Sequence, residues 1–524
     1  MDAPAQSRSP WMAFPVPEFP PLLGDSRADV CVIGAGIAGL TTAYLLTKKG
    51  KRVLVIDDGP IGGGMTCRTT AHLMSAIDDR YYEVERLHGE SGATLAAQSH
   101  AAAIDAIEAI VRHEHIDCDF ARVDGYLFIP PDGEPGELVR EYGAALRAGV
   151  EGVVWENRAP IESFDTGQCL RFPRQGQFHP LKYLSGLAHA VVRDGGAIHC
   201  GVHAQEVESG DTPCVRTSGG YTIQCDDVVV ATNSPVNDRV AIHTKQAPYI
   251  TYVIALRVPR GTVANVLLWD TLDAYHYVRL NKPDGDLLIV GGEDHKTGQA
   301  DDSERRFANL ELWARERFPA AREVVHRWTG QVMETVDYLA FIGRNPGDDH
   351  VYVATGDSGM GMTHGTIAGL VITELIHGVE IPWSRLYSPS RKPLKAAGQF
   401  ARENANVAWQ YTDWVKGGDV DSVASIAAGS GAVVRRGMHK VAVYRDPQGE
   451  LHEMSAACTH LGCPVRWNSA DNTWDCKCHG SRFDALGQVL SGPANTPLSS
   501  VEESPAVHVR NSRQGHGRPP TAGF

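Results

Sequence analysis

Residues 28–58, ADVCVIGAGIAGLTTAYLLTKKGKRVLVIDD, constrain the fold more than any other stretch of this chain. An apolar run at Val30–Ile33 enters a glycine-rich turn, a helical pattern follows to Lys49, and a second apolar run ends at Asp57. This order predicts a strand, a helix and a second parallel strand, with a phosphate-binding fingerprint in the turn. The unit therefore predicts an α/β domain that binds a dinucleotide.

The glycines of the fingerprint have separate roles. Gly34 allows the tight turn, Gly36 lets the backbone approach a pyrophosphate, and Gly39 permits close packing of helix on strand. The helix N-terminus faces the phosphates, and the acid that ends the second strand can bind ribose hydroxyls. The nucleotide-binding residues expected from this unit are Gly34, Gly36, Ile37, Ala38, Gly39, Asp57 and Asp58.

The fingerprint alone does not distinguish FAD from NAD, but three later stretches favour FAD. Residues 62–73, GGGMTCRTTAHL, can bring backbone N–H groups and Arg68 to the pyrophosphate and the flavin. A buried strand within 226–235 ends in Ala-Thr-Asn, and 350–378 reads as a strand, a glycine turn and a long helix. The positive end of that helix can stabilise a reduced flavin. These stretches add Gly64, Thr66, Arg68, Thr69, Thr70, Ala231, Thr232, Asn233, Gly356, Gly361, Met362 and Thr363.

At these residues the sequence resembles the FAD-dependent oxidoreductases of the D-amino-acid oxidase family, which includes enzymes that oxidise glycine, sarcosine and dimethylglycine. The resemblance covers about residues 30–380. It implies a Rossmann-type FAD domain interleaved with a mixed-sheet substrate domain, and a strand near Ala204 whose backbone meets the adenine. The expected parts are a Pro-rich segment at 1–27, the FAD domain at 28–80, 176–240 and 336–380, and the substrate domain at 81–175 and 241–335.

Catalytic residues are harder to assign, because hydride transfer needs positioning more than a strong base. Arg68, His72, Thr363 and His364 flank the expected flavin position. His72 is a candidate for anchoring FAD covalently or for a structural role, and Arg279 for clamping a substrate carboxylate or for a surface ion pair. Candidates for caging a substrate ammonium, or for plain strand packing, are Trp269, Tyr249, Tyr252, Tyr275 and Tyr277.

The composition changes after Pro382. Residues 381–420 are polar and basic and read as a linker with one helix around 394–416. Short strands and turns then predict a small all-β domain at 421–510 and a flexible tail at 511–524. This domain contains CTHLGCPV at 458–465 and CKCHGS at 476–481, which hold four of the chain's eleven cysteines and two histidines.

One Cys and one His from each loop, in matching order, indicate a Rieske [2Fe–2S] site. The alternative is zinc, but zinc sites usually use CxxC pairs, whereas the pairs here are CxH and CxxH. The domain closely resembles Rieske domains. The resemblance assigns Cys458 and Cys476 to one iron and His460 and His479 to the other, with the two imidazoles near solvent as the edge for electron exchange.

The same resemblance implies roles for three neighbouring positions. In cytochrome bc-type Rieske proteins the second Cys of each loop forms a disulfide, and Cys463 and Cys478 match those positions. High-potential members have a Tyr two residues after the second-loop Ser, where this chain has Phe483. Ser481 is retained, so we expect a potential within the Rieske range but not at its top.

The net charge of −14 argues against broad binding to nucleic acid or to anionic membranes. No apolar run is long enough to span a bilayer, and the N-terminus lacks the basic start and apolar core of a signal peptide. These features predict a cytoplasmic protein without a transmembrane segment.

Both halves together resemble a group of bacterial FAD-dependent oxidoreductases with a C-terminal Rieske domain. We expect a dehydrogenase or oxidase that oxidises an amine or amino-acid C–N bond by hydride transfer to FAD. Its electrons would pass singly through the cluster to an acceptor protein or quinone. The alternative is a flavin–Rieske reductase serving a separate oxygenase or redox partner, although a second dinucleotide fingerprint is missing. Only 45 residues, 480–524, follow His479, too few for the catalytic domain of a Rieske oxygenase.

Overall fold

The computed structural model describes residues 7–236, 242–273, 275–282, 286–392, 394–437 and 439–501. Besides the short internal gaps, 1–6 of the Pro-rich segment, 502–510 of the predicted β domain and the whole tail at 511–524 lie outside these residues. Within the described part of the chain, no helix is both long and apolar enough to cross a membrane.

The predicted βαβ unit is present at the centre of a largely parallel sheet. β2 (Val30–Ile33) and β3 (Val53–Asp57) pair in parallel and are joined by α1 (Ile37–Lys48). All four residues of β2 are buried, as expected for a strand covered on both faces. The strand order is β18-β19-β12-β2-β3-β8. The other strands are β8 (Ala197–Cys200), β12 (Asp227–Val230), β18 (Phe341–Arg344) and β19 (Val351–Thr355).

Small residues let two helices cross closely on this sheet. α6 (Gly361–Ile376) packs on α1, and a Cβ at Gly365 would lie 2.6 Å from Cγ2 of Ile37. A Cβ at Gly369, one turn later, would lie 2.6 Å from Cγ2 of Thr41. Both helices follow parallel strands, so their positive N-terminal ends meet at the carboxyl edge of the sheet.

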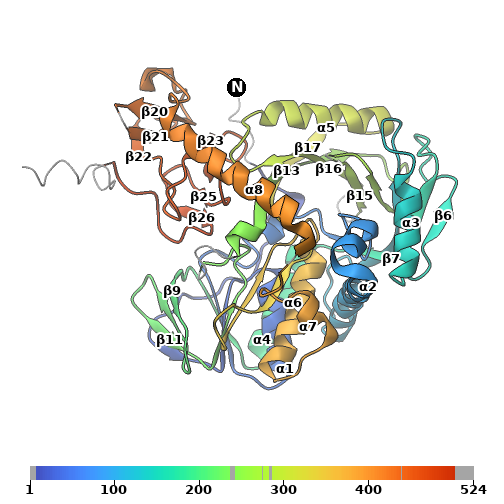
Figure 1. The fold of residues 1–524 in the computed structure, drawn as a ribbon, viewed down its shortest axis with the longest axis horizontal. Helices are drawn as coiled ribbons and strands as arrows, with labels where there is room; N and C mark the ends of the chain where they lie inside the picture. The colour runs from blue at the N-terminus through green and yellow to red at the C-terminus, as the bar shows by residue number, and fades with distance from the viewer. Residues whose placement is uncertain are drawn as a thin grey trace, which may run out of the picture.

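A second, mixed sheet forms the expected substrate half, with α5 (Ser303–Arg317) lying along it (Figure 1). Its strand order is β17-β13-β16-β15-β14-β5-β7-β4, and β6 pairs with β7. The β13–β16 register shifts between Ile250 and Tyr252, which is a bulge of the kind that re-aims side chains. The strands are β4 (His72–Leu73), β5 (Ala121–Phe128), β6 (Val154–Glu156), β7 (Cys169–Gln177), β13 (Gln246–Arg257), β14 (Leu267–Asp270), β15 (Tyr277–Asn281), β16 (Leu287–Lys296) and β17 (Val324–Thr335).

The remaining elements of this part surround the two sheets. The long α2 (Tyr81–His113) is kinked at Gly89 and packs on α3 (Glu137–Arg147) and α6, while α4 (Pro180–Arg193) packs on α1. A small sheet has the order β1-β11-β10-β9. Its strands are β1 (Ser26–Arg27), β9 (Ala204–Glu208), β10 (Cys214–Thr217) and β11 (Thr222–Gln224).

The Pro-rich N-terminal segment is packed into the fold where the structure describes it. Its short 3₁₀ helix η1 (Pro10–Ala13) buries Trp11 completely, and the indole Nε1 donates to the carbonyl of Thr69 at 2.7 Å. The segment therefore supports the loop that the sequence places beside the flavin.

The expected linker contains α7 (Pro382–Leu386) and α8 (Ala397–Gln410). The 3₁₀ helix η4 (Leu394–Ala396) precedes α8, so the helix predicted around 394–416 is present with 3₁₀ ends. α8 reaches diagonally from the α6 side of the molecule to the C-terminal domain (Figure 1). The 3₁₀ helix η5 (Tyr411–Val415) follows it. The Tyr411 hydroxyl donates to the carbonyl of Leu461 at 2.8 Å, and Trp414 Nε1 donates to that of Gly462 at 3.1 Å. The linker is thus bonded to the first cysteine loop.

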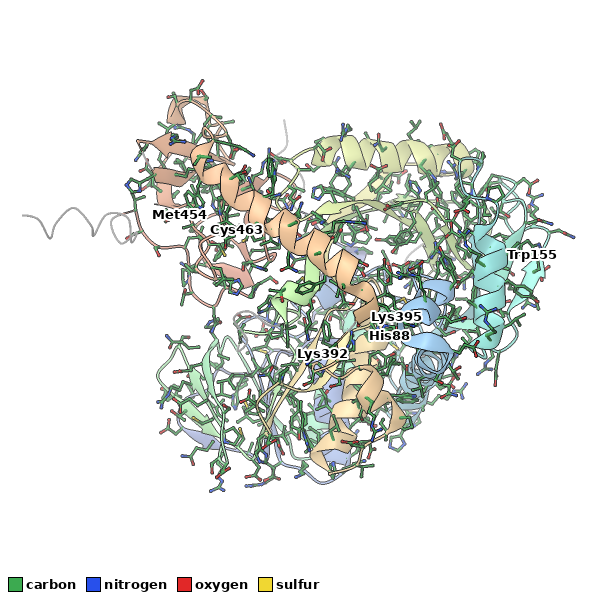
Figure 2. All side chains as sticks on the ribbon, viewed as in Figure 1. His88, Trp155, Lys392, Lys395, Met454 and Cys463 are labelled. Atoms are coloured by element: carbon green, nitrogen blue, oxygen red, sulfur yellow. A yellow bond between two sulfur atoms is a disulfide. The ribbon has the colours of Figure 1, made fainter. Side chains whose placement is uncertain are left out.

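The C-terminal domain is small and all-β, as predicted. Its core holds Trp467 and Trp474, with ring centroids 5.0 Å apart, and Figure 2 shows Met454 and Cys463 of the same core beside α8. The strands form two antiparallel sheets, β20-β21-β22 and β23-β24-β25-β26. They are β20 (Ser430–Arg436), β21 (His439–Arg445), β22 (Leu451–Ser455), β23 (Val465–Asn468), β24 (Thr473–Cys476), β25 (Arg482–Phe483) and β26 (Val489–Ser491).

The predicted fold class is therefore confirmed. The division of the first 380 residues stays a prediction, because β4 belongs to the segment assigned to the FAD domain yet pairs with β7 of the substrate sheet.

Candidate functional site

A cavity of about 830 Å³ lies at the carboxyl edge of the parallel sheet, where such folds bind their ligands. Its wall combines the fingerprint, the loop after β3, the start of α6 and the inner face of the mixed sheet. Of the predicted cofactor residues, Gly39 and Thr363 do not line it. Those that do are Gly34, Gly36, Ile37, Ala38, Asp57, Asp58, Gly64, Thr66, Arg68, Thr69, Thr70, Ala204, Ala231, Thr232, Asn233, Gly356, Gly361 and Met362.

The fingerprint forms a cradle that side chains would fill. Gly34 has φ +108°, and a Cβ there would lie 2.5 Å from the carbonyl oxygen of Ala231. A Cβ at Gly39 would lie 1.9 Å from the carbonyl oxygen of Gly34, so this glycine serves helix–strand packing. The backbone at the start of α1 is therefore free to approach a pyrophosphate, and the cradle fits FAD.

Asp57 holds the loop in this shape. Its carboxylate accepts hydrogen bonds from the backbone N–H of Ala35 at 2.6 Å and of Gly59 at 2.8 Å. Burial nevertheless raises the pKa of Asp57 to about 6. Asp57 also lines the cavity, so its expected contact with ribose hydroxyls stays a prediction.

Three of the four catalytic candidates line the cavity: Arg68, His72 and His364. Nδ1 of His364 donates to the carbonyl of Asp357 at 2.9 Å, and its Nε2 is buried without a hydrogen-bond partner. Burial lowers the pKa of His364 to about 4, so the imidazole is neutral and its Nε2 is an available acceptor. Thr363 lies behind this wall, where its hydroxyl bonds Nδ1 of His100 at 2.8 Å.

His72 has both ring nitrogens engaged. Nδ1 bonds the Thr70 hydroxyl at 3.0 Å, and Nε2 donates to the carbonyl of Val278 at 3.3 Å. Burial, reinforced by Arg279, lowers the pKa of His72 to about 3. These contacts favour the structural role for His72 over covalent attachment of FAD.

Arg279 does not act as a carboxylate clamp, because it does not line the cavity. Its Nη1 donates to the carbonyls of Thr70, Ala71 and Phe178 at 2.8–3.2 Å, and its guanidinium lies 5.3 Å from the Trp11 ring centroid. It is only 2% exposed, so the surface ion pair is also wrong. Its role is to fix the loop that leads to His72.

The aromatic candidates divide into two groups. Trp269, Tyr275 and Tyr277 line the cavity. Tyr249 and Tyr252 do not, and Tyr252 packs against Phe307 with ring centroids 5.1 Å apart. Strand packing therefore accounts for Tyr252.

Sequence reasoning missed three acidic residues on the cavity wall, Asp357 and the pair Asp78 and Asp294. Asp78 follows β4, and its Oδ2 accepts a hydrogen bond from the Tyr275 hydroxyl at 2.6 Å. Asp294 lies in the β13–β16 bulge, where it and Glu293 of β16 face Thr251 of β13, and no sequence pattern predicts this bulge. In Asp78 and Asp294, Oδ1 is buried without a hydrogen-bond partner.

The four predicted cluster ligands come together at the tips of two loops. Cys458 and Cys476 are buried, and the Cys476 thiol lies close enough to hydrogen-bond Cys458 and lower its pKa. The ring centroids of His460 and His479 are 5.0 Å apart. Nδ1 of His479 is buried without a hydrogen-bond partner, as a nitrogen reserved for a metal would be.

The arrangement suits two irons better than one zinc. A single zinc ion needs at least three side chains whose donor atoms all lie close together. Among the described residues, the group with all its donor atoms within 4.8 Å of one another is Asp446, Glu450 and His452, on another turn. The cysteine and histidine pairs do not converge on one point in this way, whereas a [2Fe–2S] cluster holds them on separate irons. The chemistry and spacing of the donors therefore fit a Rieske cluster.

Cys463 and Cys478 form the disulfide implied by the resemblance, with their Cα atoms 6.3 Å apart. Phe483 is fully buried opposite Trp474 in the β24–β25 ladder, and Ser481 accepts a hydrogen bond from the backbone N–H of Ala494 at 3.0 Å. The expected effect of Phe483 on the cluster potential stays a prediction.

The expectation that both imidazoles lie near solvent is wrong for His479, which is 6% exposed. The ring of His243, from the flavin half of the chain, lies 5.1 Å from that of His460 and 6.4 Å from that of His479. The histidine side of the cluster loops therefore faces the flavin half.

The C-terminal domain also forms part of the cavity wall. Residues 488–492 and 494–497 line it together with the fingerprint loops. The Asn495 amide donates to the carbonyls of Ala204 and Gln205 at 3.0 and 2.7 Å, in the strand expected to meet the adenine. Gln331 of β17 lines the cavity and donates through Nε2 to the carbonyl of Gly480 at 2.8 Å, one residue after the predicted ligand His479.

This combination of a dinucleotide cavity and a cluster site defines a flavoprotein oxidoreductase with a Rieske [2Fe–2S] centre. A family model described as FAD dependent oxidoreductase matches residues 29–375, and one described as Rieske [2Fe-2S] domain matches residues 414–502. The chain belongs to the FAD dependent oxidoreductase family, binds FAD and carries a Rieske [2Fe–2S] domain.

Three relatives illustrate the two parts. "Putative Rieske 2Fe-2S iron-sulfur protein YhfW" of Bacillus subtilis is 32% identical over 499 residues, covering 93% of this chain and 96% of the relative. "Gamma-glutamylputrescine oxidoreductase" of Escherichia coli is 26% identical over 367 residues, covering 67% and 84%. The crystal structure of glycine oxidase from Geobacillus kaustophilus has a TM-score of 0.60 at 20% identity, covering 70% of this chain and 99% of that one.

Proposed function

We propose that this enzyme oxidises the C–N bond of an amine or amino acid and delivers the electrons singly, through the Rieske cluster, to an acceptor protein or quinone. Bound FAD supplies the hydride acceptor. The substrate loses a C–H hydrogen with its electron pair and a proton from nitrogen, and becomes an imine. The two electrons then leave one at a time, to two equivalents of a one-electron acceptor or to one quinone.

One observation carries this proposal: the cluster domain forms part of the cavity wall. Gln331 lines the cavity and bonds the residue next to a cluster ligand, so a single hydrogen bond links the two sites. A reductase serving a separate oxygenase would also need a site for a nicotinamide donor, and the described residues show no second fingerprint of that kind.

The chain's own residues supply binding and proton handling. Neutral His364 offers Nε2 as an acceptor for the amine proton, and the loop carrying His72 is fixed by Arg279. Residues 488–492 and 494–497 line the cavity and add apolar surface to its wall. We further propose that the lining residues of the predicted set, together with Cys458, His460, Cys476 and His479, bind the two cofactors.

The test is an anaerobic titration of the holoenzyme with amines, amino acids and NADH, following flavin absorbance and the EPR signal of the reduced cluster. We expect a C–H donor next to nitrogen to bleach the flavin and then to reduce the cluster, and NADH to do neither. If NADH reduces both centres while no amine or amino acid does, the reductase function replaces the one proposed.

A further inference from the structure

The part of the cavity bounded by the mixed sheet carries two carboxyl groups, each with one oxygen that lacks a hydrogen-bond partner. Oδ1 of Asp78 and Oδ1 of Asp294 are buried without hydrogen bonds, although both side chains line the cavity. An ionised carboxylate removed from water costs several kcal/mol unless it is paired. Two such oxygens on one wall indicate that a positively charged group of the bound ligand pairs with them.

No basic side chain among the described lining residues supplies that partner. Arg68 is bound to Asp471, and His203 contacts Asp58 and Asn495 at the other end of the cavity. The remaining two, His72 and His364, are neutral because burial lowers their pKa values.

Two arginines approach from behind the wall but are occupied elsewhere. Arg80 pairs with Glu137 at 3.2 Å and also donates to the carbonyl of Asp78. Arg306 pairs with Asp302 at 2.7 Å and donates to the carbonyl of Asp294 at 3.3 Å. Both therefore bind the backbone of the acidic residues and leave the two Oδ1 atoms unpaired.

Aromatic rings lie beside these oxygens. Tyr275, which donates to Asp78, and Tyr277 have ring centroids 5.4 Å apart. The Tyr277 hydroxyl bonds that of Thr251 at 2.8 Å, in the bulge opposite Asp294. Carboxylates next to tyrosine faces are the surroundings that an organic ammonium group prefers.

The same wall is unsuited to a substrate carboxylate. A bound carboxylate needs a cation, usually an arginine that binds through two hydrogen bonds. Arg279, the sequence candidate for that role, is turned to backbone carbonyls outside the cavity. An amino-acid carboxylate placed here would instead meet Asp78 and Asp294.

We propose that this wall selects a dicationic amine, such as an alkyl diamine, and rejects substrates that carry a carboxylate. Asp78 and Asp294 bind the ammonium group that is not oxidised, while the other nitrogen is placed for oxidation. This inference rests on the proposed function and specifies its substrate class.

The first test measures binding without turnover. The full-length holoenzyme is titrated with n-butyltrimethylammonium and with butanoate, which have the same alkyl chain and opposite charge, and the flavin difference spectrum is followed. We expect the cation to bind at least about tenfold more tightly, because ionised Asp78 and Asp294 attract a cation and repel butanoate. Equal or tighter binding of butanoate would overturn the proposal.

Variants then assign the effect to the two residues. We expect Asp78→Asn and Asp294→Asn each to weaken binding of the cation by about tenfold or more. Asp273→Asn is the control, because Asp273 is exposed near Asp294 but does not line the cavity. FAD content and circular dichroism check folding. Unchanged affinity in two folded variants would refute the assignment, and the wild-type comparison remains decisive if a variant fails to fold.

A second arm separates this inference from the proposed function. Anaerobic 1,4-diaminobutane, 4-aminobutanoate and glycine are compared as reductants of the flavin, and we expect the diamine to be fastest. If 4-aminobutanoate or glycine matches it, the charge selection fails while the dehydrogenase function stands. If no donor bleaches the flavin although the cation binds selectively, the charge selection stands and the dehydrogenase function fails.

Discussion

Arg68 and Asp471 are 403 positions apart in the chain and form an ion pair, with Nη1 and Oδ1 3.2 Å apart. Asp471 also binds Arg482 of its own domain, at 2.5 Å, and accepts a hydrogen bond from the Thr329 hydroxyl. The pair therefore joins the loop beside the flavin to the domain that holds the cluster. Arg68, a catalytic candidate on sequence grounds, serves at least to dock the two halves.

We predict that Asp471→Asn lowers the free energy of unfolding of the docked state by about 3 kcal/mol, because breaking a buried ion pair leaves a charge unpaired. Asp301→Asn is the matched control, since exposed Asp301 bonds Ser469 across the same interface. Urea unfolding followed by tryptophan fluorescence measures both. Equal, small effects would show that the buried pair contributes nothing to docking.

The Asp471 pair also predicts a dependence on acid. Burial alone would raise the pKa of the Asp471 carboxyl, but Arg482 and Arg68 outweigh burial and hold the pKa below its usual value of 3.8. A lowered folded pKa means that this stability is complete above the unfolded value and is lost as the pH falls toward the folded value. The difference between wild type and Asp471→Asn should therefore be constant near neutrality and shrink below about pH 4.

Gln331 provides a test of the electron route. We predict that Gln331→Leu slows electron transfer from reduced flavin to cluster by about tenfold, because it removes the hydrogen bond to Gly480. Reduction of the flavin by substrate and the cluster potential should stay close to wild type. Flash photolysis of the holoenzyme measures the transfer directly.

The control for this variant is Gln299→Leu. Gln299 also bonds a cluster-loop carbonyl, that of Lys477, at 3.3 Å, but it does not line the flavin cavity. If both variants slow transfer equally, general docking explains the effect and the Gln331 route is wrong.

The disulfide closes a loop between Cys463 and Cys478, which are 15 positions apart. Replacing both by Ser should lower the stability of the cluster domain by about 3 kcal/mol, the loop-entropy value for this length. The cluster should then be lost at a lower temperature, as followed by visible circular dichroism. Cys200→Ser with Cys214→Ser controls for removing two free cysteines. Alkylation of Cys463 and Cys478 in the native oxidised protein would contradict the bond.

Cation binding should depend on pH through Asp294. Burial is the main cause that raises the pKa of Asp294 to about 7. A hydrogen bond from the Thr251 side chain and the charge of Arg306 oppose the rise, while Asp78 and Asp273 add to it. A carboxyl group binds a cation in its ionised form, so affinity for n-butyltrimethylammonium should fall as the pH decreases from about 8 to 6. Asp294→Asn should flatten this profile. Tighter binding at the lower pH would show that another group controls the site.

Local patterns predicted the fold and much of the candidate site. The fingerprint at Gly34–Gly39 and the paired Cys/His loops require a particular backbone within a few residues, so their structure follows from the sequence. Asp294 and Gln331 could not be found in this way. Asp294 owes its position to a bulge, and Gln331 to the docking of a domain encoded about 150 residues later.

For Arg279 the sequence suggested a role in the substrate site, but the structure places the residue outside the cavity. An arginine at this position suggested a ligand for a substrate carboxylate. The guanidinium of Arg279 instead points toward backbone carbonyls near Thr70 and toward the Trp11 ring. The packing of the Pro-rich segment determines which backbone carbonyls need a side-chain donor. That packing is a property of the tertiary structure, so local sequence does not predict it. The same applies to His479, whose burial depends on the neighbouring domain.

The loop that includes Asn495 has a consequence for how the protein matures. Because this loop supplies part of the cavity wall, the nucleotide pocket is incomplete until the C-terminal domain has folded against the flavin half. The binding of the flavin and the folding of the cluster domain are therefore coupled through one shared wall.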